Sequence, residues 1–501
     1  MLRSEAERSR WIWFILLAGF ALRMYGLGQE SLWLDEIMTA VRVHESVHDI
    51  LFGWDSGNQG PIYFLWTKAW ALLAGTSEFS LRFWSAIWGT LTIQLVYVLA
   101  RQFFSGTGSI LAALFFAVHP FAIYYSQEAR PYALFLFLAV AAFILLFSLM
   151  RQFRWLSAIS FVLVSAMTFY THPYGVFVIL SEVILYYSFK GTGKFRGAAR
   201  YPRPYFITFI ILFLLCAPGA IQHAIALADK MSGLTATSWL EKPGLYKLLT
   251  TPAKYFMNAQ IGAVVILLTS VLAVLRFYSE TRLRPGFRFL LILAISFWLV
   301  PWLIAVTVSP IYDLRYTIPG LLVVIFLMAT ASASLQALPR QLFVAVVLGL
   351  TMYPLWNYYT KTDKDPWRET GEYLSARLEA ADVVIPYPPF TNEAVQYYLL
   401  PHLRDQVIRV DSVQALVPIL NSTNRFWVVE SYSPLAQHYL DMLPVIETTG
   451  RNVRTVNITD MLDVDPNAFW VCPIRVSLRE NFILHEQFGP VPADTASHAA
   501  E

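Results

Sequence analysis

Two adjacent carboxylates follow the first long apolar segment of the chain. Asp35 and Glu36 come directly after Trp33-Leu34. A carboxylate just past a membrane exit can act as general base for a hydroxyl group presented at the membrane surface. The same residues also fit a helix start, with Ser31 or Asp35 as the N-cap and Glu36 complementing the helix dipole. The pair is a candidate catalytic centre, and both interpretations stay open.

A second set of candidate residues occupies the turns between apolar segments. Glu128 and Arg130 precede one such segment, and Arg315 precedes another. Arginine binds phosphate bidentately, so these two cations could hold an anionic headgroup at the membrane surface. Tyrosines in the same turns are typical of the aromatic belt at a membrane interface. Further candidates for substrate binding, in these turns or in the first loop, are Tyr132, His172, Tyr316 and Gln59.

The stretch His44-Glu45-Ser46-Val47-His48 matches the pattern H-E-x-x-H. On a helix this spacing places His44 and His48 on one face, as a zinc metalloprotease requires, with Glu45 as the base. The pattern is short, and no third histidine follows at the metzincin spacing. An amphipathic helix at the membrane surface explains the same residues. A divalent metal is therefore a weak candidate, and the sequence establishes no cofactor.

The composition shows what kind of scaffold positions these residues. Of the 501 residues, 56% are hydrophobic and only 14% are charged, whereas a soluble chain carries about 25% charged residues. This excludes an ordinary soluble enzyme, a disordered protein and a disulfide scaffold. Residues 360–501 hold 30 of the 71 charged residues. We therefore predict a membrane domain over 1–359 and a soluble domain over 360–501.

A membrane-spanning helix needs about 20 mostly apolar residues. The chain offers eleven candidates, at 11–27, 79–100, 108–125, 131–150, 155–171, 174–189, 205–222, 261–278, 288–308, 317–335 and 341–358. The segment 61–74 is also apolar, but Lys68 in its middle argues against a full span. The sequence thus predicts an α-helical polytopic membrane protein with about eleven spans.

The orientation of these spans follows from the distribution of lysine and arginine. With the N-terminus in the cytoplasm, the cytoplasmic segments carry 16 of the 26 basic residues of 1–359 and only three acidic ones. Eleven spans then place the C-terminal domain and the first loop, 28–78, on the exoplasmic side. The turns that carry the candidate carboxylates and arginines fall on that same side.

At these residues the chain resembles bacterial members of the protein O-mannosyltransferase-like and aminoarabinose-transferase-like membrane glycosyltransferases, which have the GT-C fold. The Asp-Glu pair and the Gln-Glu-Ala-Arg-Pro-Tyr run are the specific parts of this resemblance. Its pieces keep the order and sidedness of the family over about the first two-thirds of the chain. They are Leu22-Arg23-Met24-Tyr25-Gly26-Leu27, Ser31-Leu32-Trp33-Leu34-Asp35-Glu36, Tyr125-Ser126-Gln127-Glu128-Ala129-Arg130-Pro131-Tyr132-Ala133-Leu134, Thr171-His172-Pro173-Tyr174-Gly175 and Leu314-Arg315-Tyr316.

The resemblance implies transfer of a sugar from a polyprenyl-phosphate-linked donor to an acceptor hydroxyl of a lipid, glycan or protein. The reaction would occur at the exoplasmic face of a bacterial inner membrane, with inversion at the anomeric carbon. By this similarity Asp35 matches the acid that deprotonates the acceptor, and Glu36 orients the acceptor or that acid. Glu128 matches an acidic position, and Arg130 and Arg315 hold the lipid phosphate as it leaves. A base activating a weak nucleophile, with cations facing the charge that develops on phosphate, is coherent chemistry.

One stretch departs from the family pattern. Many relatives carry a His-Pro-Pro or Lys-Pro-Pro type motif where this chain has Asn58-Gln59-Gly60-Pro61. Only Pro61 is kept, so a charged or imidazole contact to donor or acceptor is missing. This departure leaves the identity of the acceptor open.

The C-terminal region is predicted to be a mixed α/β domain. It contains no glycine-rich phosphate loop, so we expect an accessory domain that covers the site or binds the acceptor. The expected elements are a helix from Trp367 to about Leu378, strands at 382–386, 406–410 and 425–432, and a helix at 391–400.

Two other classes of function remain as alternatives. A transporter or lipid flippase would need charged or broken spans near the midplane and repeat symmetry. Glu182 is the only acidic residue in a predicted span, and the sequence shows no repeat. The other alternative is a membrane zinc metalloprotease that uses His44, Glu45 and His48. No nucleic-acid partner is expected, because a net charge of +3 is too small to indicate one.

Overall fold

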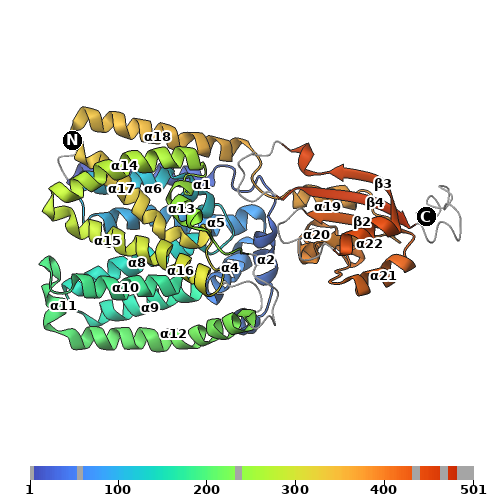
Figure 1. Ribbon diagram of the computed structural model, residues 1–501, viewed down its shortest axis with the longest axis horizontal. Helices are drawn as coiled ribbons and strands as arrows, with labels where there is room; N and C mark the ends of the chain where they lie inside the picture. Colours follow the sequence, from blue (N-terminus) through green and yellow to red (C-terminus); the bar gives the residue numbers. More distant parts are fainter. Residues whose placement is uncertain (1–4, 54–59, 232–239, 432–440, 463–471, 482–501) are drawn as a thin grey trace. The chain divides into compact units, whose positions relative to one another are not determined.

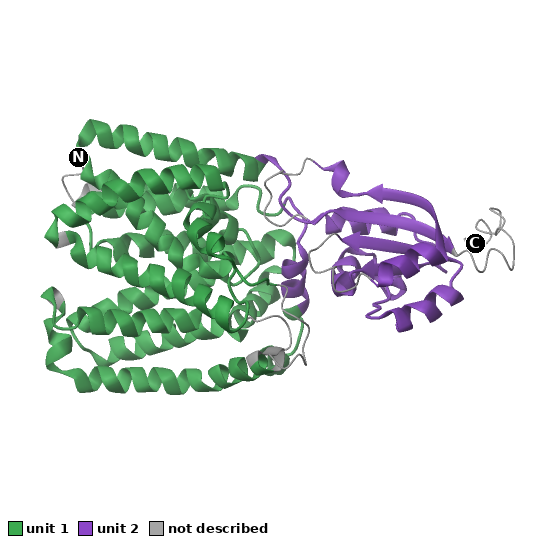
Figure 2. Ribbon diagram, viewed as in Figure 1, with its two compact units in different colours: residues 1–28, 42–359 green, residues 29–41, 360–501 purple. Residues whose placement is uncertain are grey.

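The computed structural model describes residues 5–53, 60–231, 240–431, 441–462 and 472–481. The chain divides into two compact units, shown in different colours in Figure 2. Unit 1 contains residues 1–28 and 42–359, and unit 2 contains residues 29–41 and 360–501. The segment that carries Asp35 and Glu36 therefore belongs to the same unit as the C-terminal region.

Unit 1 is helical, and its long helices run alongside one another (Figure 1). Short 3-10 turns lie at Gly193–Phe195, Thr281–Leu283 and Arg315–Gly320, and the π-helical turn Ile295–Leu299 joins α15 to α16. The α-helices are α1 (Glu5–Met24), α3 (Val47–Phe52), α4 (Pro61–Ala74), α5 (Glu78–Ala100), α6 (Gly106–Val118), α7 (Pro120–Ser126), α8 (Tyr132–Arg151), α9 (Trp155–Thr171), α10 (Gly175–Phe189), α11 (Arg196–Arg200), α12 (Pro202–Met231), α13 (Leu245–Lys254), α14 (Ala259–Ser279), α15 (Arg284–Ala294), α16 (Val300–Thr307), α17 (Leu321–Ser334) and α18 (Ala337–Thr360).

In the part of the chain that the structure describes, seven helical segments are long and apolar enough to cross a membrane, and an eighth counts if α6 and α7 form one bent span. Each of the eleven predicted spans contains a helix. However, α9 and α10 have only 17 and 15 residues, and α1 begins with several charged residues. The chain is thus a multi-pass helical protein, and the number eleven stays a prediction. The seven are Glu78–Ala100, Tyr132–Arg151, Pro202–Ala226, Ala259–Ser279, Arg284–Thr307, Arg315–Ser334 and Ala337–Thr360.

The α6–α7 pair is bent by 57° at His119-Pro120. Proline has no backbone N–H to donate and restricts the residue before it, so the helix must break there.

Burial separates the enclosed spans from those at the periphery: 83% of the apolar window at Arg315–Ser334 is buried, but only 22% at Ala337–Thr360. Two enclosed spans begin at candidate residues, Tyr132 and Arg315, and the bent pair leads into the turn with Glu128 and Arg130.

Unit 2 contains a four-stranded mixed sheet in the order β1-β2-β4-β3. The strands β1 and β2 are parallel, with Val383 opposite Phe426, whereas β4 runs antiparallel to both β2 and β3. Unit 2 also has 3-10 turns at Pro389–Thr391, Pro401–Gln406 and Thr459–Met461. Its elements are α2 (Leu34–Arg42, whose last residue belongs to unit 1), α19 (Trp367–Ser375), β1 (Val383–Tyr387), α20 (Asn392–Tyr398), α21 (Val413–Ser422), β2 (Arg425–Ser431), α22 (Met442–Thr449), β3 (Gly450–Asn457) and β4 (Ile474–Asn481).

The sheet confirms the predicted strands at 382–386 and 425–432 and corrects the one at 406–410. That stretch makes only an isolated bridge between Val407 and Val384, together with a hydrogen bond from Ile408 N to the Val384 carbonyl at 2.9 Å. It borders β1 too briefly to form a strand. The strands β3 and β4, which the sequence analysis did not predict, supply the antiparallel half of the sheet.

Candidate active site

Three turns of unit 1 converge on a cluster of aromatic rings. Tyr132 is the first residue of α8, His172 follows α9, and Tyr316 lies in the 3-10 turn after α16. The ring centre of His172 lies 5.8 Å from that of Tyr132 and 5.0 Å from that of Tyr316. Tyr132 and Tyr316 are 6.4 Å apart and stacked. The turns that sequence analysis placed on one side of the membrane thus meet in space.

Both candidate arginines border this cluster. Arg130 and Arg315 are buried, and their positive charges both act on His172. Asp313 fixes Arg315 from two directions: its carboxylate lies 3.4 Å from the guanidinium Nε and accepts a hydrogen bond from the Arg315 backbone N–H at 3.0 Å. Asp313 was not among the predicted site residues, although the spacing Asp-x-Arg in a turn is a usable signal for such a pair.

His172 is a neutral ring with a defined tautomer. The Tyr174 backbone N–H donates to His172 Nδ1 at 3.1 Å, so the proton of the neutral ring lies on Nε2. Burial, assisted by the charges of Arg130 and Arg315, lowers the pKa of His172 to about 3. At neutral pH this side chain can donate a hydrogen bond from Nε2, but it carries no charge. It is suited to orient a substrate and not to act as a general acid.

The turn that carries Glu128 and Arg130 is held by the end of α1. Fully buried Arg23 donates from Nη1 to the carbonyls of Gly19 and Ala117, each at 2.9 Å, and from Nε to Ser126 Oγ at 3.1 Å. Ala117 lies in the last turn of α6, where carbonyls lack a donor within their own helix. Arg23 therefore supplies a hydrogen-bond donor to a carbonyl that the break between α6 and α7 leaves without one.

Gln127 completes this attachment. Its side-chain amide donates to the carbonyl of Tyr25 at 2.7 Å and to that of Arg23 at 3.1 Å. The adjacent Glu128 is completely buried, and its charge acts on Tyr125 of α7. The resembling sequence pieces at 22–27 and 125–134 are thus parts of one packed structure.

Asp35 and Glu36 lie in the first turn of α2, in unit 2. Glu36 is completely buried, and its Oε2 accepts a hydrogen bond from the Trp33 backbone N–H at 3.4 Å. A glutamate at the third helical position that binds the N-cap amide is one half of a capping box. Glu36 therefore complements the helix start as predicted, but the N-cap is Trp33, so the prediction of Ser31 or Asp35 as the N-cap is wrong. Asp35, at the second helical position, is half-buried.

Comparisons with a protein family and with solved structures identify the fold of the chain. Residues 58–221 match the sequence model of the family described as dolichyl-phosphate-mannose-protein mannosyltransferase. No curated protein sequence matches the chain significantly. Apo ArnT from Cupriavidus metallidurans is similar in structure, with a TM-score of 0.55 at 13% identity over 94% of this chain and 98% of ArnT. The chain has the GT-C fold.

Two further solved structures share this GT-C fold. ArnT from Cupriavidus metallidurans bound to undecaprenyl phosphate gives a TM-score of 0.53 at 12% identity, over 94% of this chain and 98% of that one. The apo oligosaccharyltransferase of Archaeoglobus fulgidus gives 0.54 at 12% identity, over 90% of this chain and 73% of that one. The resemblance to mannosyltransferase-like GT-C proteins, inferred from sequence motifs, is confirmed by this fold and the family match.

The H-E-x-x-H stretch of this GT-C chain does not lie on one helix. His44 is in the turn after α2, and Ser46 is the N-cap of α3, which begins at Val47. His48 lies on α3 and contacts the carboxylate of Asp49 at 3.4 Å. The helical face that a zinc metalloprotease needs is therefore absent from this stretch. Within the described residues, no group of three or more histidine, cysteine and acidic side chains is placed to hold a metal ion.

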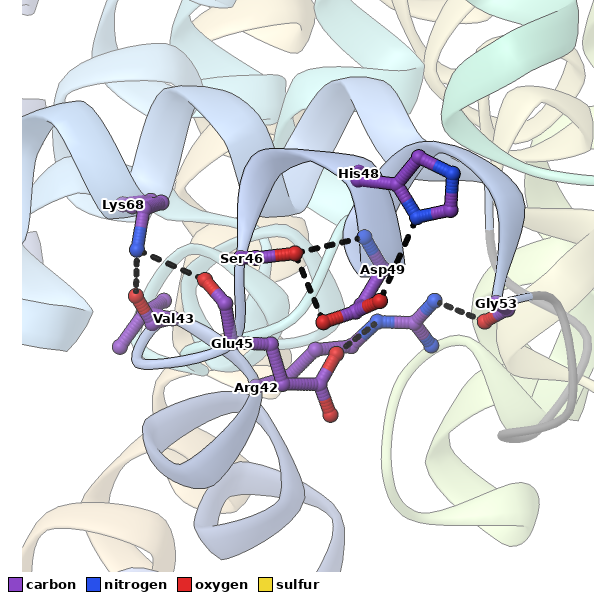
Figure 3. Close-up of polar contacts among 8 residues, drawn as sticks. All are labelled: Arg42, Val43, Glu45, Ser46, His48, Asp49, Gly53 and Lys68. Carbon is purple, nitrogen blue, oxygen red and sulfur yellow. Dashed lines mark hydrogen bonds and ion pairs between the residues drawn. The ribbon is translucent and has the colours of Figure 1, made fainter.

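Lys68 holds this turn of the GT-C chain, and Arg42 holds the end of α3, each through backbone carbonyls (Figure 3). Lys68 donates to the carbonyls of Val43 and Glu45 at 2.9 and 2.8 Å. Arg42 donates to the carbonyl of Gly53 at 2.8 Å. These contacts explain Lys68 in the apolar helix α4 without a membrane span. Gln59, the last predicted substrate-binding residue, lies outside the described residues.

One buried carboxylate of the GT-C chain was missed by the sequence analysis. Asp365 accepts hydrogen bonds from the backbone N–H of Cys472 at 2.8 Å and from Trp367 Nε1 at 3.2 Å. Burial raises its pKa to about 7, and the negative charge of Asp35 contributes to that rise. In the sequence, an aspartate before Pro366-Trp367 has only the ordinary pattern of a helix start.

Proposed function

We propose that this protein transfers a sugar from a polyprenyl-phosphate-linked donor to an acceptor hydroxyl at the exoplasmic face of a bacterial inner membrane, with inversion. The observation that carries the proposal is the buried cluster in unit 1, where the positive charges of Arg130 and Arg315 both lower the pKa of His172. Two buried arginines beside aromatic rings suit a phosphate that arrives on a lipid. ArnT, which shares the fold, was solved with undecaprenyl phosphate.

In the proposed step, the acceptor hydroxyl oxygen attacks the anomeric carbon of the sugar. The bond from that carbon to the phosphate oxygen breaks, and its electron pair goes to the phosphate. Asp35 takes the proton of the hydroxyl as general base. Arg130 and Arg315 bind the leaving phosphate and stabilise the charge that develops on it.

The remaining candidates act on binding and orientation. Glu36 supports Asp35, because its capping contact with Trp33 fixes the first turn of α2. We assign donor or acceptor contacts to Tyr132, His172 and Tyr316, whose rings form the cluster, and to Gln59. Glu128, buried next to Arg130, keeps its proposed place at the catalytic turn.

The proposal also fixes sidedness and partners. The turns of the cluster and the C-terminal unit face the exoplasm, as the distribution of basic residues predicts. The partners are the lipid-linked donor, an acceptor lipid, glycan or protein, and the surrounding membrane lipids.

Binding of undecaprenyl phosphate to the purified protein tests the proposal without knowledge of the sugar. Undecaprenol, which has the same chain without the charge, is the matched control ligand. We expect saturable binding of the phosphate that far exceeds binding of the alcohol and depends on Arg130. Equal binding of both lipids would contradict the proposed phosphate site.

Turnover is measured with a radiolabelled polyprenyl-phosphate sugar and a membrane extract as the source of acceptor. Label should move to the acceptor with the wild type and not with Asp35→Asn. Parallel reactions with a chelator test the divalent metal. Equal transfer of label to the acceptor by the wild type and by Asp35→Asn would remove Asp35 from the mechanism.

A further inference from the structure

The segment that leads into α2 has no regular secondary structure of its own. Residues 29–33 run from the last residue of the turn after α1 to the start of α2 at Leu34. Backbone N–H and C=O groups that are buried outside helices and sheets need partners from elsewhere in the molecule. Leu32 is completely buried, so water cannot satisfy its amide.

Within unit 2, the C-terminal part of the chain supplies these partners residue by residue. The Arg368 guanidinium donates to the Gln29 carbonyl at 2.6 Å. The Leu32 backbone N–H donates to the phenolic oxygen of Tyr398, at the end of α20, at 2.7 Å. Both backbone contacts come from residues beyond position 360.

Side chains of the segment make the same kind of contact. Glu30 Oε1 accepts a hydrogen bond from the Asp363 backbone N–H at 2.7 Å, and the Ser31 hydroxyl donates to the Asp365 carbonyl. The Lys364 ammonium lies 5.7 Å from the ring centre of Trp33.

We propose that the C-terminal domain holds the first loop in its reactive position, with Tyr398 as a positioning residue for Asp35. This inference rests on the proposed function, in which Asp35 is the base. It assigns the domain a task beyond covering the site or binding the acceptor. The domain anchors 29–32, and the helix that starts at Leu34 carries Asp35 in its first turn.

The physical reason is the sensitivity of proton transfer to distance. A general base must lie within hydrogen-bond reach of the proton that it takes. A misplacement of about 1 Å can lower a rate by about 100-fold. Residues 29–32 have no helix or strand ladder to fix them, so loss of one anchor lets Asp35 shift.

The test substitution is Tyr398→Phe in the full-length protein, which removes only the hydroxyl that accepts from Leu32. The matched control is Tyr373→Phe in α19 of the same unit, because the Tyr373 hydroxyl makes no hydrogen bond to any residue that the structure describes. We expect Tyr398→Phe to lower kcat by about 10-fold or more while KM for the polyprenyl-phosphate sugar changes by less than about 2-fold. The control should keep both values. Thermal unfolding of each variant reports whether the protein folds.

A double-variant comparison separates positioning from a general structural effect. If Tyr398 acts through Asp35, Tyr398→Phe should cause no further loss of the residual turnover of Asp35→Asn. A full additional loss in that background, or wild-type kcat in Tyr398→Phe, would overturn the inference. Wild-type turnover in Asp35→Asn would instead overturn the proposed function, so the two failures are distinguishable.

Discussion

Replacement of Asp365 by asparagine tests how burial acts on a carboxyl group beside the Asp35 segment. The pKa of Asp365 is raised to about 7 from an ordinary value of 3.8, chiefly because burial disfavours the ionised form. The folded state therefore binds a proton that the unfolded state releases between these two values. Its contribution lowers stability as pH rises from 3.8, and the loss is complete above about pH 7.

The size of this effect follows from the two pKa values. Each pKa unit corresponds to about 1.4 kcal/mol, so the full difference is about 4 kcal/mol. Between about pH 5 and about pH 8 the wild type should lose about 2 to 3 kcal/mol through Asp365 alone. Asp365→Asn removes this loss, because the carboxamide does not ionise. The carboxamide keeps only one acceptor oxygen, so it also removes the acceptor of either Trp367 Nε1 or the Cys472 N–H. This loss costs about 1 to 3 kcal/mol and does not depend on pH.

The assay is thermal unfolding of the full-length protein in detergent at about pH 5 and at about pH 8. The variant should gain stability relative to the wild type as the pH rises. Thr370→Ala, which removes a buried hydroxyl bonded to the Pro366 carbonyl, is a control without a titrating group, and its effect should be equal at both pH values. A variant that becomes relatively less stable at the higher pH would refute the reasoning.

Three further predictions concern the chemistry and the topology. Asp35→Asn should lower turnover by about 100-fold or more with donor binding retained, the size expected for a lost general base. His44→Ala should stay active. An inactive His44→Ala variant that had also lost zinc would restore the metal hypothesis. Arg130→Ala and Arg315→Ala should each weaken binding of undecaprenyl phosphate, the double variant should lose less than the sum, and Arg→Lys should also impair binding because it lacks the planar fork. The control is Arg288→Ala, because Arg288 lies in a predicted cytoplasmic segment. Unchanged affinity in both Arg130→Ala and Arg315→Ala, with only expression reduced, would mean that Arg130 and Arg315 merely stabilise span ends. A cysteine placed in 190–203 should resist a membrane-impermeant reagent in intact cells while one near Asp35 reacts, and the reverse pattern would invert the topology.

Local patterns in the sequence were sufficient to predict the helical scaffold, and they nominated the candidate site residues. Long apolar runs predict helices because a segment inside a membrane must hydrogen-bond its own backbone N–H and C=O groups. Every predicted span contains a helix. The turns with Tyr132, His172 and Tyr316 could be placed on one side from the basic residues alone. Their convergence within 6.4 Å agrees with that placement.

Two other predictions were wrong because residue spacing alone did not determine the structure. The spacing of His44 and His48 suits a helix, but Ser46 caps a new helix between them. The stretch 406–410 is apolar enough for a strand, but it meets β1 at a single bridge. The first outcome depends on a local cap, because the Ser46 hydroxyl accepts from the Asp49 N–H. The second depends on how many residues pair with β1, and periodicity describes neither.

The sequence by itself determined that this protein is a multi-pass helical chain with carboxylates and arginines at the ends of apolar segments. Only the tertiary structure decided the state and support of those groups. Burial and two nearby arginines make His172 neutral, and a tyrosine more than 360 residues away satisfies the amide of Leu32. Patterns of hydropathy and charge describe a few neighbouring residues along the chain. Desolvation and tertiary hydrogen bonds depend on which distant segments pack together.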